Sequence, residues 1–372
     1  MVSCIGFQLF RLPSVNMGLP RSTDGQTCTK TRRPRCPRTL KVGSDFSGLD
    51  AGAVALKRLG VEHTVQFTCD TLKASYTIMN KVHAPVKIFT DIMSRTKEDE
   101  EPVDVYFWTP PCQDVSSSGK RTGLQGPRQT GKLIKKSMSY IKVNRPRLTI
   151  FENVPAIMNA KFKYIPIGIK KALESIGYEV HTSILNSRDY GSPQDRRRVF
   201  IVGFKEDALK HKFHWPKITQ APSINSILDP WKPTDKACRL PGWENGQARC
   251  KDAFKTCYNN GRDPSSTPIM VDVDASKRFS SFGVDEAKTL TRSRGGSGGP
   301  WVSTRGRRMT INELVKLQGF QKSDIMWEEL KISERTVGQM LGNAVNVNTM
   351  ACILEEALWS AGLVMKKVTF PR

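Results

Sequence analysis

Apolar and polar residues alternate along most of the chain in the manner of short buried strands separated by amphipathic helices. Apolar runs typical of strands fall at residues 40–46, 64–69, 104–109, 148–151 and 199–204. Helical periods fall at residues 51–59, 71–80, 132–143, 165–175, 311–317 and 347–359. Regular alternation of strand and helix predicts an α/β fold, a doubly wound and mostly parallel sheet with helices on both faces.

Two parts of the chain depart from this alternation. Residues 1–38 hold seven basic side chains and four prolines against a single acid, Asp24, and predict a flexible basic tail. A targeting segment, a nucleic-acid-binding arm or a wrongly assigned reading-frame start would have the same composition. Residues 205–286 are rich in Pro, Lys and Trp without a clear period, and they predict a small inserted or appended domain.

The charge balance points to a polyanionic partner. Lys and Arg number 58 against 35 Asp and Glu, a net charge of +23. Nucleic acid is favoured, because basic side chains gain by displacing counterions from phosphates; a basic protein that is merely solvated is the alternative. No apolar run approaches the roughly 18 residues that a membrane helix needs, so we expect a soluble protein with no membrane partner.

Cysteine usage argues against a metal site. The nine cysteines include no CxxC pair, and a chain of 372 residues does not need disulfides to fold, which favours a reducing compartment. Cys238, Cys250 and Cys257, with His211 and His214 upstream, could supply ligands, but their spacing fits no familiar site. We therefore expect no metal.

The loops that follow the first three strands suit a nucleoside cofactor. A Gly-bearing turn, Phe46-Ser47-Gly48-Leu49, follows the first strand and would let the backbone approach a ligand closely. Asp70 ends the second strand, where a carboxylate can accept from ribose hydroxyls. Asp91-Ile92 ends a third loop and suits an adenine amino group beside an apolar contact. This set fits S-adenosylmethionine at least as well as a dinucleotide.

The later loops carry reactive groups. Pro110-Pro111-Cys112-Gln113 places a cysteine just past a strand end, and Lys120 and Arg121 follow it. A buried inert thiol is the ordinary fate of cysteine, but this polar loop is not a core environment, and nearby positive charge would favour the nucleophilic thiolate. The next strand ends in Glu152-Asn153, a candidate acid–base group. Arg196 and Arg198 would point to one face of a strand, where they could grip phosphate or a carbonyl, or pair at a sheet edge.

In this order and spacing, the motifs resemble the DNA (cytosine-5)-methyltransferase family over roughly residues 39–362. The matching segments are FSGLDAG, TDI, PPCQDVSSSG, FENV, YGSPQDRRRVFIVG, TLT, RRMTINELVKLQGF and QMLGNAV. The resemblance implies an S-adenosylmethionine-dependent enzyme with a Rossmann-like sheet and a small target-recognition domain. It also implies a substrate of double-stranded DNA, whose target cytosine must be flipped out of the helix to be reached.

Roles for individual residues follow from the resemblance. Cys112 would attack carbon 6 of cytosine, Glu152 would hold and protonate N3, and Arg198 would hold O2. Gln194 and Arg196 would shape the pocket and the catalytic loop, and Asn153 would brace the site. The implied cofactor-binding residues are Phe46, Ser47, Gly48, Leu49, Asp70, Asp91, Ile92, Pro111 and Asn343. The implied DNA-binding residues are Lys120, Arg121 and Arg128, in a closing loop at 116–131, and Arg292, Arg294 and Arg307.

The implied domains are a catalytic, cofactor-binding domain of residues 39–204 and 338–365, and a target-recognition region with a DNA-facing basic segment at 205–337. Asp50-Ala51 stands where the family usually has Gly-Gly, which puts the geometry of the cofactor turn in question. Asn346 replaces a common Pro, and Asp70 a usual Glu. Two alternatives stay open: methylation of tRNA, although the Cys-Phe-Thr segment of that branch is absent, and a catalytically idle DNA-binding regulator. We expect a monomer, nuclear if the cell is eukaryotic, with an organelle suggested by residues 1–38.

Overall fold

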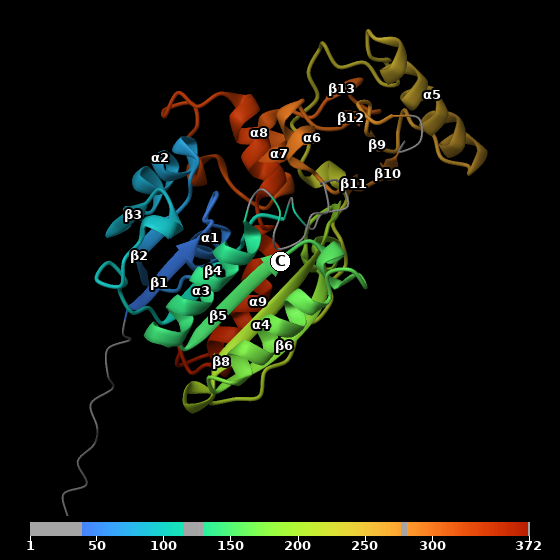
Figure 1. Cartoon of the computed structure of the whole chain (residues 1–372). Helices are drawn as coiled ribbons and strands as arrows, with labels where there is room; N and C mark the ends of the chain where they lie inside the picture. The colour runs from blue at the N-terminus through green and yellow to red at the C-terminus, as the bar shows by residue number, and fades with distance from the viewer. Residues whose placement is uncertain (1–38, 113, 115–125, 127–128, 277–280, 371–372) are drawn as a thin grey trace, which may run out of the picture. The chain divides into compact units, whose positions relative to one another are not determined.

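A seven-stranded sheet organises the computed structural model, which describes residues 39–112, 114, 126, 129–276 and 281–370 (Figure 1). The strand order is β3-β2-β1-β4-β5-β8-β6. Their bounds are Lys87–Phe89 (β3), His63–Cys69 (β2), Leu40–Asp45 (β1), Val105–Trp108 (β4), Leu148–Asn153 (β5), Arg197–Lys205 (β8) and Tyr178–Asn186 (β6). β8 runs antiparallel to β5 and β6, and the other pairs are parallel. The predicted α/β fold with a mostly parallel sheet is confirmed.

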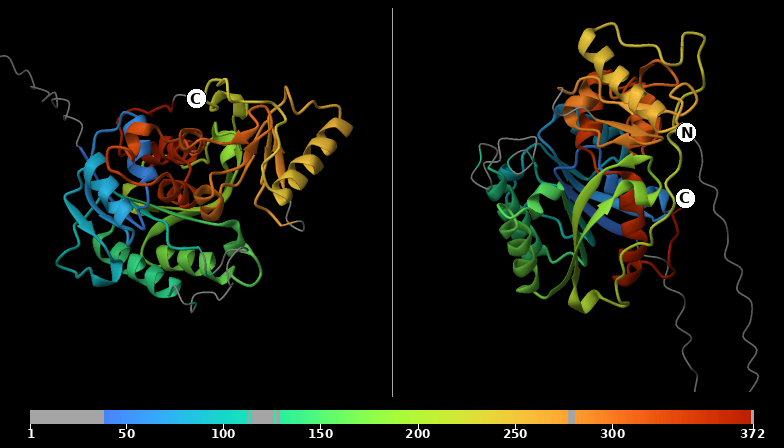
Figure 2. Two further views of the ribbon diagram at one scale, coloured as in Figure 1. Left: turned by 90° about the horizontal axis from the view of Figure 1, so that it is seen from above. Right: turned by 90° about the vertical axis from the view of Figure 1, so that its right-hand side faces the viewer.

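Helices cover both faces of this sheet, because successive strand side chains point to opposite faces. On β4, Phe107 packs in one apolar cluster with α1 (Ala51–Arg58) and α9 (Val347–Ser360). Its neighbours Tyr106 and Trp108 pack in the other cluster, with α3 (Thr130–Asn144) and α4 (Tyr164–Glu174). Figure 2 shows the green helices on one side of the sheet and the red helix α9 on the other. α9, near the C-terminus, therefore packs against α1 and the side of the sheet that α1 covers.

A second, smaller layer is built from residues after β8. Its sheet has the order β10-β9-β12-β13, with bounds Phe282–Val284 (β10), Ile269–Val271 (β9), Trp301–Val302 (β12) and Arg307–Arg308 (β13). Helix α5 (Glu244–Asn259) packs on it through Cys250, Phe254 and Cys257. This helix was not predicted from the sequence, because its apolar stripe is narrow and the remaining positions are polar.

The remaining elements link these two layers or complete the large sheet. They are α2 (Lys73–Val82), β7 (Gln194–Asp195), β11 (Ala287–Lys288), α6 (Arg292–Gly296), α7 (Ile311–Leu317) and α8 (Glu334–Asn343). The short 3-10 helices are Ile92–Ser94, Pro155–Met158, Ser187–Tyr190, Glu206–Ala208, Ile224–Ser226 and Lys322–Asp324. β7, just before β8, pairs with β11 in a two-stranded parallel ribbon, which connects the region of the large sheet to the residues that follow β10.

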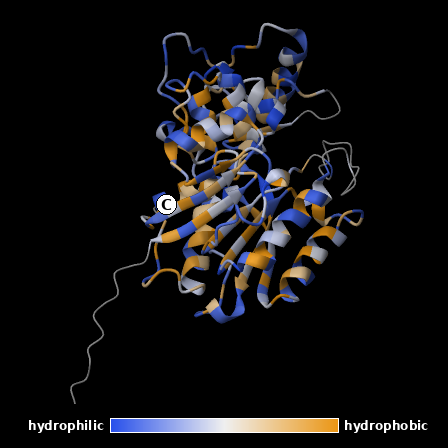
Figure 3. Cartoon of the chain, turned by 60° about the vertical axis from the view of Figure 1, so that its left-hand side comes forward, coloured by the Kyte–Doolittle hydropathy of each residue, from blue (hydrophilic) through white to orange (hydrophobic). Residues whose placement is uncertain are grey.

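Hydropathy follows this arrangement. Figure 3 shows helices at the surface that carry both orange and blue positions, as expected where one side of a helix covers a sheet and the other faces water. α9 is buried on nearly every side, and its buried residues include the apolar run Met350–Leu354. In the part of the chain that the structure describes, no helix is long and apolar enough to span a bilayer. The predicted tail at 1–38 lies outside the described residues.

Candidate active site at the carboxyl edge of the sheet

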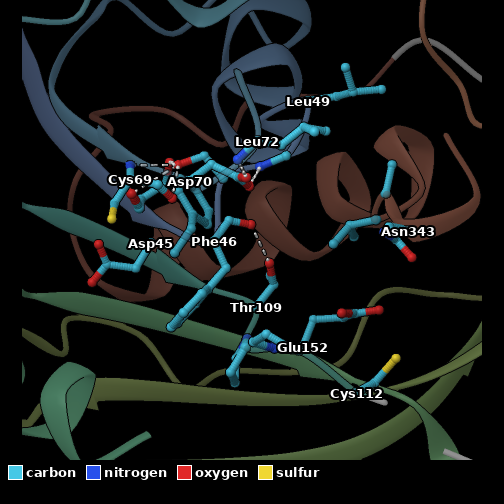
Figure 4. Close-up of a pocket in the computed structure, with 18 of the residues that line it drawn as sticks. Asp45, Phe46, Leu49, Cys69, Asp70, Leu72, Thr109, Cys112, Glu152 and Asn343 are labelled. Carbon is cyan, nitrogen blue, oxygen red and sulfur yellow. Dashed lines mark hydrogen bonds between the residues drawn. The ribbon is translucent and has the colours of Figure 1, made fainter. Parts of the chain in front are cut away.

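The strand ends enclose a cavity of about 1040 Å³ (Figure 4). Loops after β1, β2, β4 and β5 form its walls together with the end of α8. Loops after parallel strands converge at one edge of a sheet, which is where such folds bind ligands. All nine residues predicted to bind the cofactor line it: Phe46, Ser47, Gly48, Leu49, Asp70, Asp91, Ile92, Pro111 and Asn343. Cys112, Glu152, Asn153 and Arg198 line the same cavity.

The turn after β1 is held open by hydrogen bonds to β2. Phe46 and Gly48 have φ angles of 60° and 56°, so the backbone twice enters the left-handed region. The Gly48 N–H donates to Asp70 Oδ2 at 2.8 Å, and the Ser47 N–H donates to the Cys69 carbonyl at 3.0 Å. Asp70 also accepts from the Leu72 N–H at 2.9 Å. Asp70 therefore fixes the turn while its carboxylate lies on the cavity wall.

Asp50 shows how the turn after β1 can form although Asp50-Ala51 stands in place of a Gly-Gly pair. It adopts a left-handed conformation, φ 46° and ψ 60°, in which Asp is tolerated better than most residues. Its carboxylate caps α1 by accepting from the Ala53 N–H at 3.1 Å, and it accepts from Ser44 Oγ at 2.8 Å. The second glycine of the segment, Gly52, is required for packing, because a Cβ there would lie 2.7 Å from the Phe107 ring. The turn thus keeps its shape without Gly at position 50.

We expect Asp50→Ala to destabilise the protein by about 1–3 kcal/mol, because it removes a helix cap and leaves a Cβ residue in the left-handed region. Asp50→Asn should cost less, since an amide oxygen can still cap α1, and Asp50→Gly should relieve the strain while losing the cap. Urea unfolding of the three variants measures the differences. Equal stability of Asp50→Ala and wild type would contradict this account of the turn.

A buried ion pair below the turn was missed by the sequence analysis. Arg95 binds Asp45 through two hydrogen bonds, 2.7 Å and 3.0 Å long, and both side chains are fully buried. The guanidinium also lies over the rings of Phe67 and Tyr140, 4.9 Å and 5.1 Å from their centroids. Burial raises the pKa of Asp45, and Arg95 acts against that shift. The pair joins the residue before Phe46 to the segment that follows Asp91-Ile92, so it holds two cofactor loops together.

Replacing Arg95 with Met should cost about 3–5 kcal/mol of unfolding free energy, because it leaves a carboxylate buried without its partner. Adding Asp45→Asn should recover part of this loss. The matched control is Lys87→Met, which removes the exposed Lys87–Glu101 pair, 3.7 Å long, and should cost less than about 1 kcal/mol. Urea unfolding provides the comparison. Equal losses for Arg95→Met and Lys87→Met would show that burial of the Arg95 pair is unimportant.

The cysteine loop after β4, the end of β5 and the start of β8 bring a thiol, an acid and a guanidinium into one cavity. Figure 4 shows Cys112 and Glu152 side by side near the end of the sheet, with Asn343 across the cavity. Glu152 is buried, and its Oε1 lies 3.1 Å from Arg198 Nε. Burial raises the pKa of Glu152, while Arg198 and Arg196 act to lower it. Asn153 Nδ2 donates to the Pro110 carbonyl at 3.0 Å, which ties the strand end to the cysteine turn.

The protonation state expected for Cys112 is corrected by the structure. Burial raises the pKa of the Cys112 thiol and the Glu152 carboxylate raises it further, against the opposing effects of Arg198 and Arg196. Local positive charge does favour the thiolate, as expected, but among the described residues burial and Glu152 outweigh it; Lys120 and Arg121, on which the expectation partly rested, lie outside these residues. Desolvation of the anion outweighs the two guanidiniums.

It follows that the Cys112 sulfur should become more reactive as the pH rises. With a raised pKa, Cys112 is mostly protonated near neutrality, and the thiolate fraction grows about tenfold per pH unit below that pKa. Alkylation of Cys112 by iodoacetamide, which needs only the thiolate, should therefore become faster in this proportion from about pH 6.5 to about pH 8.5, with Cys112→Ser as the unreactive control. A rate that is flat across this range would contradict the prediction.

Gln194 and Arg196 support the site without facing the cavity. Arg196 is buried, and its guanidinium donates to the carbonyls of Leu290, Gly342 and Ala344 at 2.8, 3.3 and 2.6 Å. Gln194 Oε1 accepts from the Leu290 N–H at 3.1 Å. Both side chains therefore hold backbone groups of residues 290–344 against the segment that leads into β8. This agrees with a role in shaping the pocket, although a cation held by three carbonyls is not free to contact substrate.

The predicted DNA-binding arginines have different surroundings. Arg292 is exposed and lines the cavity. Arg294 Nε donates to Asp272 at 2.7 Å, and Arg307 binds both Asp235 and the buried Glu313 at 2.9–3.0 Å. Arg307 is thus part of an ion-pair network with 22% of its side chain exposed, and its contact with DNA stays a prediction. Lys120, Arg121 and Arg128 lie outside the described residues, as does most of the loop predicted to close.

In the described part of the chain, no group of three or more His, Cys, Asp or Glu side chains is arranged so that it could hold a metal ion. Cys250 and Cys257 are instead buried between α5 and the small sheet.

Comparisons with known proteins agree with this geometry. The family model for C-5 cytosine-specific DNA methylase matches residues 40–359. The type II methyltransferase M.MthTI of Methanothermobacter thermautotrophicus is 34% identical over 326 residues, 83% of this chain and 94% of that protein. M.FnuDI of Fusobacterium nucleatum is 31% identical over 58% of this chain and 61% of its own length. In fold, the chain is similar to the S. pombe Dnmt2 methyltransferase, with a TM-score of 0.60, 17% identity, and coverage of 86% and 98%. The chain belongs to the C-5 cytosine-specific DNA methylase family.

Proposed function

We propose that this protein transfers a methyl group from S-adenosylmethionine to carbon 5 of a cytosine flipped out of double-stranded DNA. The observation that carries the proposal is the convergence of Cys112, Glu152 and Arg198 on the wall of a cavity whose other side is lined by the nucleoside-type loops. A nucleophile, an acid and a cation within one cavity suit addition to a polar ring. The family membership supports the same reaction.

The cavity residues fit the cofactor. Asp70 would accept from the ribose hydroxyls, Asp91 from the adenine amino group beside Ile92, and the Phe46–Gly48 turn would hold the methionine part. Asp91 Oδ1 already accepts from the Met93 N–H at 2.9 Å, which fixes its carboxylate in the loop. When bound, S-adenosylmethionine supplies an electrophilic methyl group.

Glu152 supplies the proton that the addition requires. The Cys112 sulfur forms a bond to carbon 6, and the electron pair displaced from the ring is neutralised by a proton passed from Glu152 to N3. Carbon 5 would then take the methyl group and pass its proton to water, the bond from sulfur to carbon 6 would break to release the Cys112 thiolate, and N3 would return its proton to Glu152, which restores the ring. The raised pKa of Glu152 supports this role, because burial keeps the carboxyl group protonated to higher pH. Arg198, already 3.1 Å from Glu152, would hold the base oxygen.

The later residues would bind the DNA. We propose 205–337 as the target-recognition region and 39–204 with 338–365 as the catalytic domain. Arg292, exposed at the cavity, is the described arginine best suited to hold a phosphate beside the flipped base. A base must leave the helix to enter such a cavity, at a cost of a few kcal/mol that contacts of this kind offset.

The test is transfer of labelled methyl groups to unmethylated genomic DNA and, separately, to total tRNA. Label in DNA supports the proposal, and sequencing of the product then gives the recognised site. Label in tRNA alone would overturn the DNA substrate, and label in neither, with no binding of S-adenosylmethionine, would overturn the activity. We further propose that the active protein is a monomer.

A further inference from the structure

The outer surfaces of α3 and α4 form a lysine-rich face next to the cavity. The two helices pack side by side on the same face of the sheet (Figures 1 and 2). Their exposed side chains, with those of the segment leading into α4, include Lys132, Lys135, Lys142, Lys161, Lys163, Lys170 and Lys171. Among the described residues of 129–175, Glu174 is the one exposed acid. We call this surface the α3–α4 lysine face.

One end of this face adjoins the catalytic groups. α3 begins at Thr130, whose Oγ1 donates to Asp114 at 2.8 Å, two residues beyond Cys112. Leu133 lines the cavity, whereas Lys132 and Lys135 are exposed on the outside of the helix. α4 likewise follows β5, since ten residues separate Asn153 from Tyr164, where the helix starts. The N-terminal ends of both helices therefore lie at the edge of the sheet that carries the site.

Acidic groups lie at the other end. Glu174, the last residue of α4, has its Oε1 3.6 Å from Lys170 Nζ. Glu100 accepts from Asn144, the last residue of α3, at 3.2 Å. By contrast, none of the ion pairs among the described residues involves Lys132, Lys135 or Lys163. Lys142 and Lys171, at the far end, are likewise in no ion pair among the described residues. What distinguishes the two ends is that the acids Glu174 and Glu100 lie at the far end, while Lys132, Lys135 and Lys163 lie beside the site.

We propose that Lys132, Lys135 and Lys163 bind backbone phosphates of the duplex that flanks the target cytosine, so that DNA continues from the cavity over the N-terminal ends of α3 and α4. The inference rests on the proposed DNA substrate and adds a second contact surface to it. Flexible lysines suit phosphates without reading sequence. Tyr164, 52% exposed beside Lys163, can pack against the sugar–phosphate backbone.

The test compares two triple variants of the full chain. Lys132→Gln/Lys135→Gln/Lys163→Gln removes the proposed contacts, and Lys142→Gln/Lys170→Gln/Lys171→Gln removes the same charge from the far ends of the same helices. The probe is an unmethylated duplex that carries the recognised site with long flanks, together with a short unmethylated duplex that holds the site alone. Each phosphate contact contributes about 0.9 to the slope of log affinity against log salt, so the first variant should lose about 2–3 from the slope on the long duplex.

The same variant should bind the short duplex as wild type does, raise KM for the long duplex and leave kcat unchanged. Hydroxyl-radical protection should shrink on one side of the target base. Equal salt slopes for the two variants, or an equal loss of affinity for both duplexes, would overturn the proposal that the α3–α4 lysine face binds the flanking DNA. If wild type methylates DNA and the first variant matches it in every respect, this inference fails while the proposed function stands; if wild type neither binds nor methylates DNA, the function itself fails.

Discussion

Replacing Cys112 with serine should reduce methyl transfer to DNA by at least about 10⁴-fold, because removal of a nucleophile from a concerted site leaves little residual rate. A serine hydroxyl is almost the same size as the thiol but a much weaker nucleophile without a base to activate it. The acid beside it, Glu152, is predicted to donate a proton and not to remove one. The loss should therefore lie in kcat, with affinity for DNA and for S-adenosylmethionine retained.

The measurement uses single-turnover methylation and a covalent trap. A duplex containing 5-fluorocytosine should form a complex stable to denaturing gels with wild type and none with Cys112→Ser, since the fluorine cannot leave as a proton does. Cys238→Ser is the matched control, because that half-buried thiol lies outside the cavity. A Cys112→Ser variant with wild-type rates would disprove the covalent mechanism, whereas loss of activity in Cys238→Ser would point to a general effect on folding.

Glu152→Gln should lower kcat by about 10²–10⁴-fold, the contribution usual for a positioned general acid. The amide is nearly isosteric and can still hold N3, but it cannot supply a proton. The same substitution should stabilise the folded protein near neutral pH. Glu152 has a pKa raised by burial, so the folded state binds its proton more tightly than the unfolded chain does.

The upward direction of the Glu152 pKa shift determines the pH range in which Glu152→Gln stabilises the protein. The free energy of unfolding of wild type falls as the pH rises from the ordinary carboxyl pKa of 4.5 to the raised value in the folded state. Gln has no such dependence, so the stabilising difference should be present at neutral pH and should shrink in acid. Urea unfolding at several pH values measures it, with the exposed Glu174→Gln as control. A variant that is less stable than wild type at neutral pH would show that the Glu152–Arg198 ion pair outweighs the cost of burial.

The positions of the reactive groups along the chain were predictable from local pattern. Pro-Pro-Cys-Gln and Phe-Glu-Asn each follow a short apolar run, and the ends of neighbouring parallel strands necessarily meet at one edge of the sheet. For that reason Cys112 and Glu152 could be assigned to one site before their geometry was known. The helix α5 and the edge strand β6 were not predicted, because only part of each is buried and their apolar periods are correspondingly weak.

The sequence by itself determined the alternation of strands and helices in the large sheet apart from its edges, the identity of the loops that form the cavity, and the family, since each depends on residues close together in the chain. Only the tertiary structure decided which charged side chains face the cavity and which are bound by other parts of the protein. Arg196 and Arg198 are two residues apart, yet Arg196 is held by three carbonyls from the late chain and Arg198 faces Glu152. Asp45 finds Arg95 fifty residues away, and Cys112 keeps its proton because burial outweighs the cations beside it. Ionisation and ion pairing depend on burial and on partners distant in sequence, which no local pattern contains.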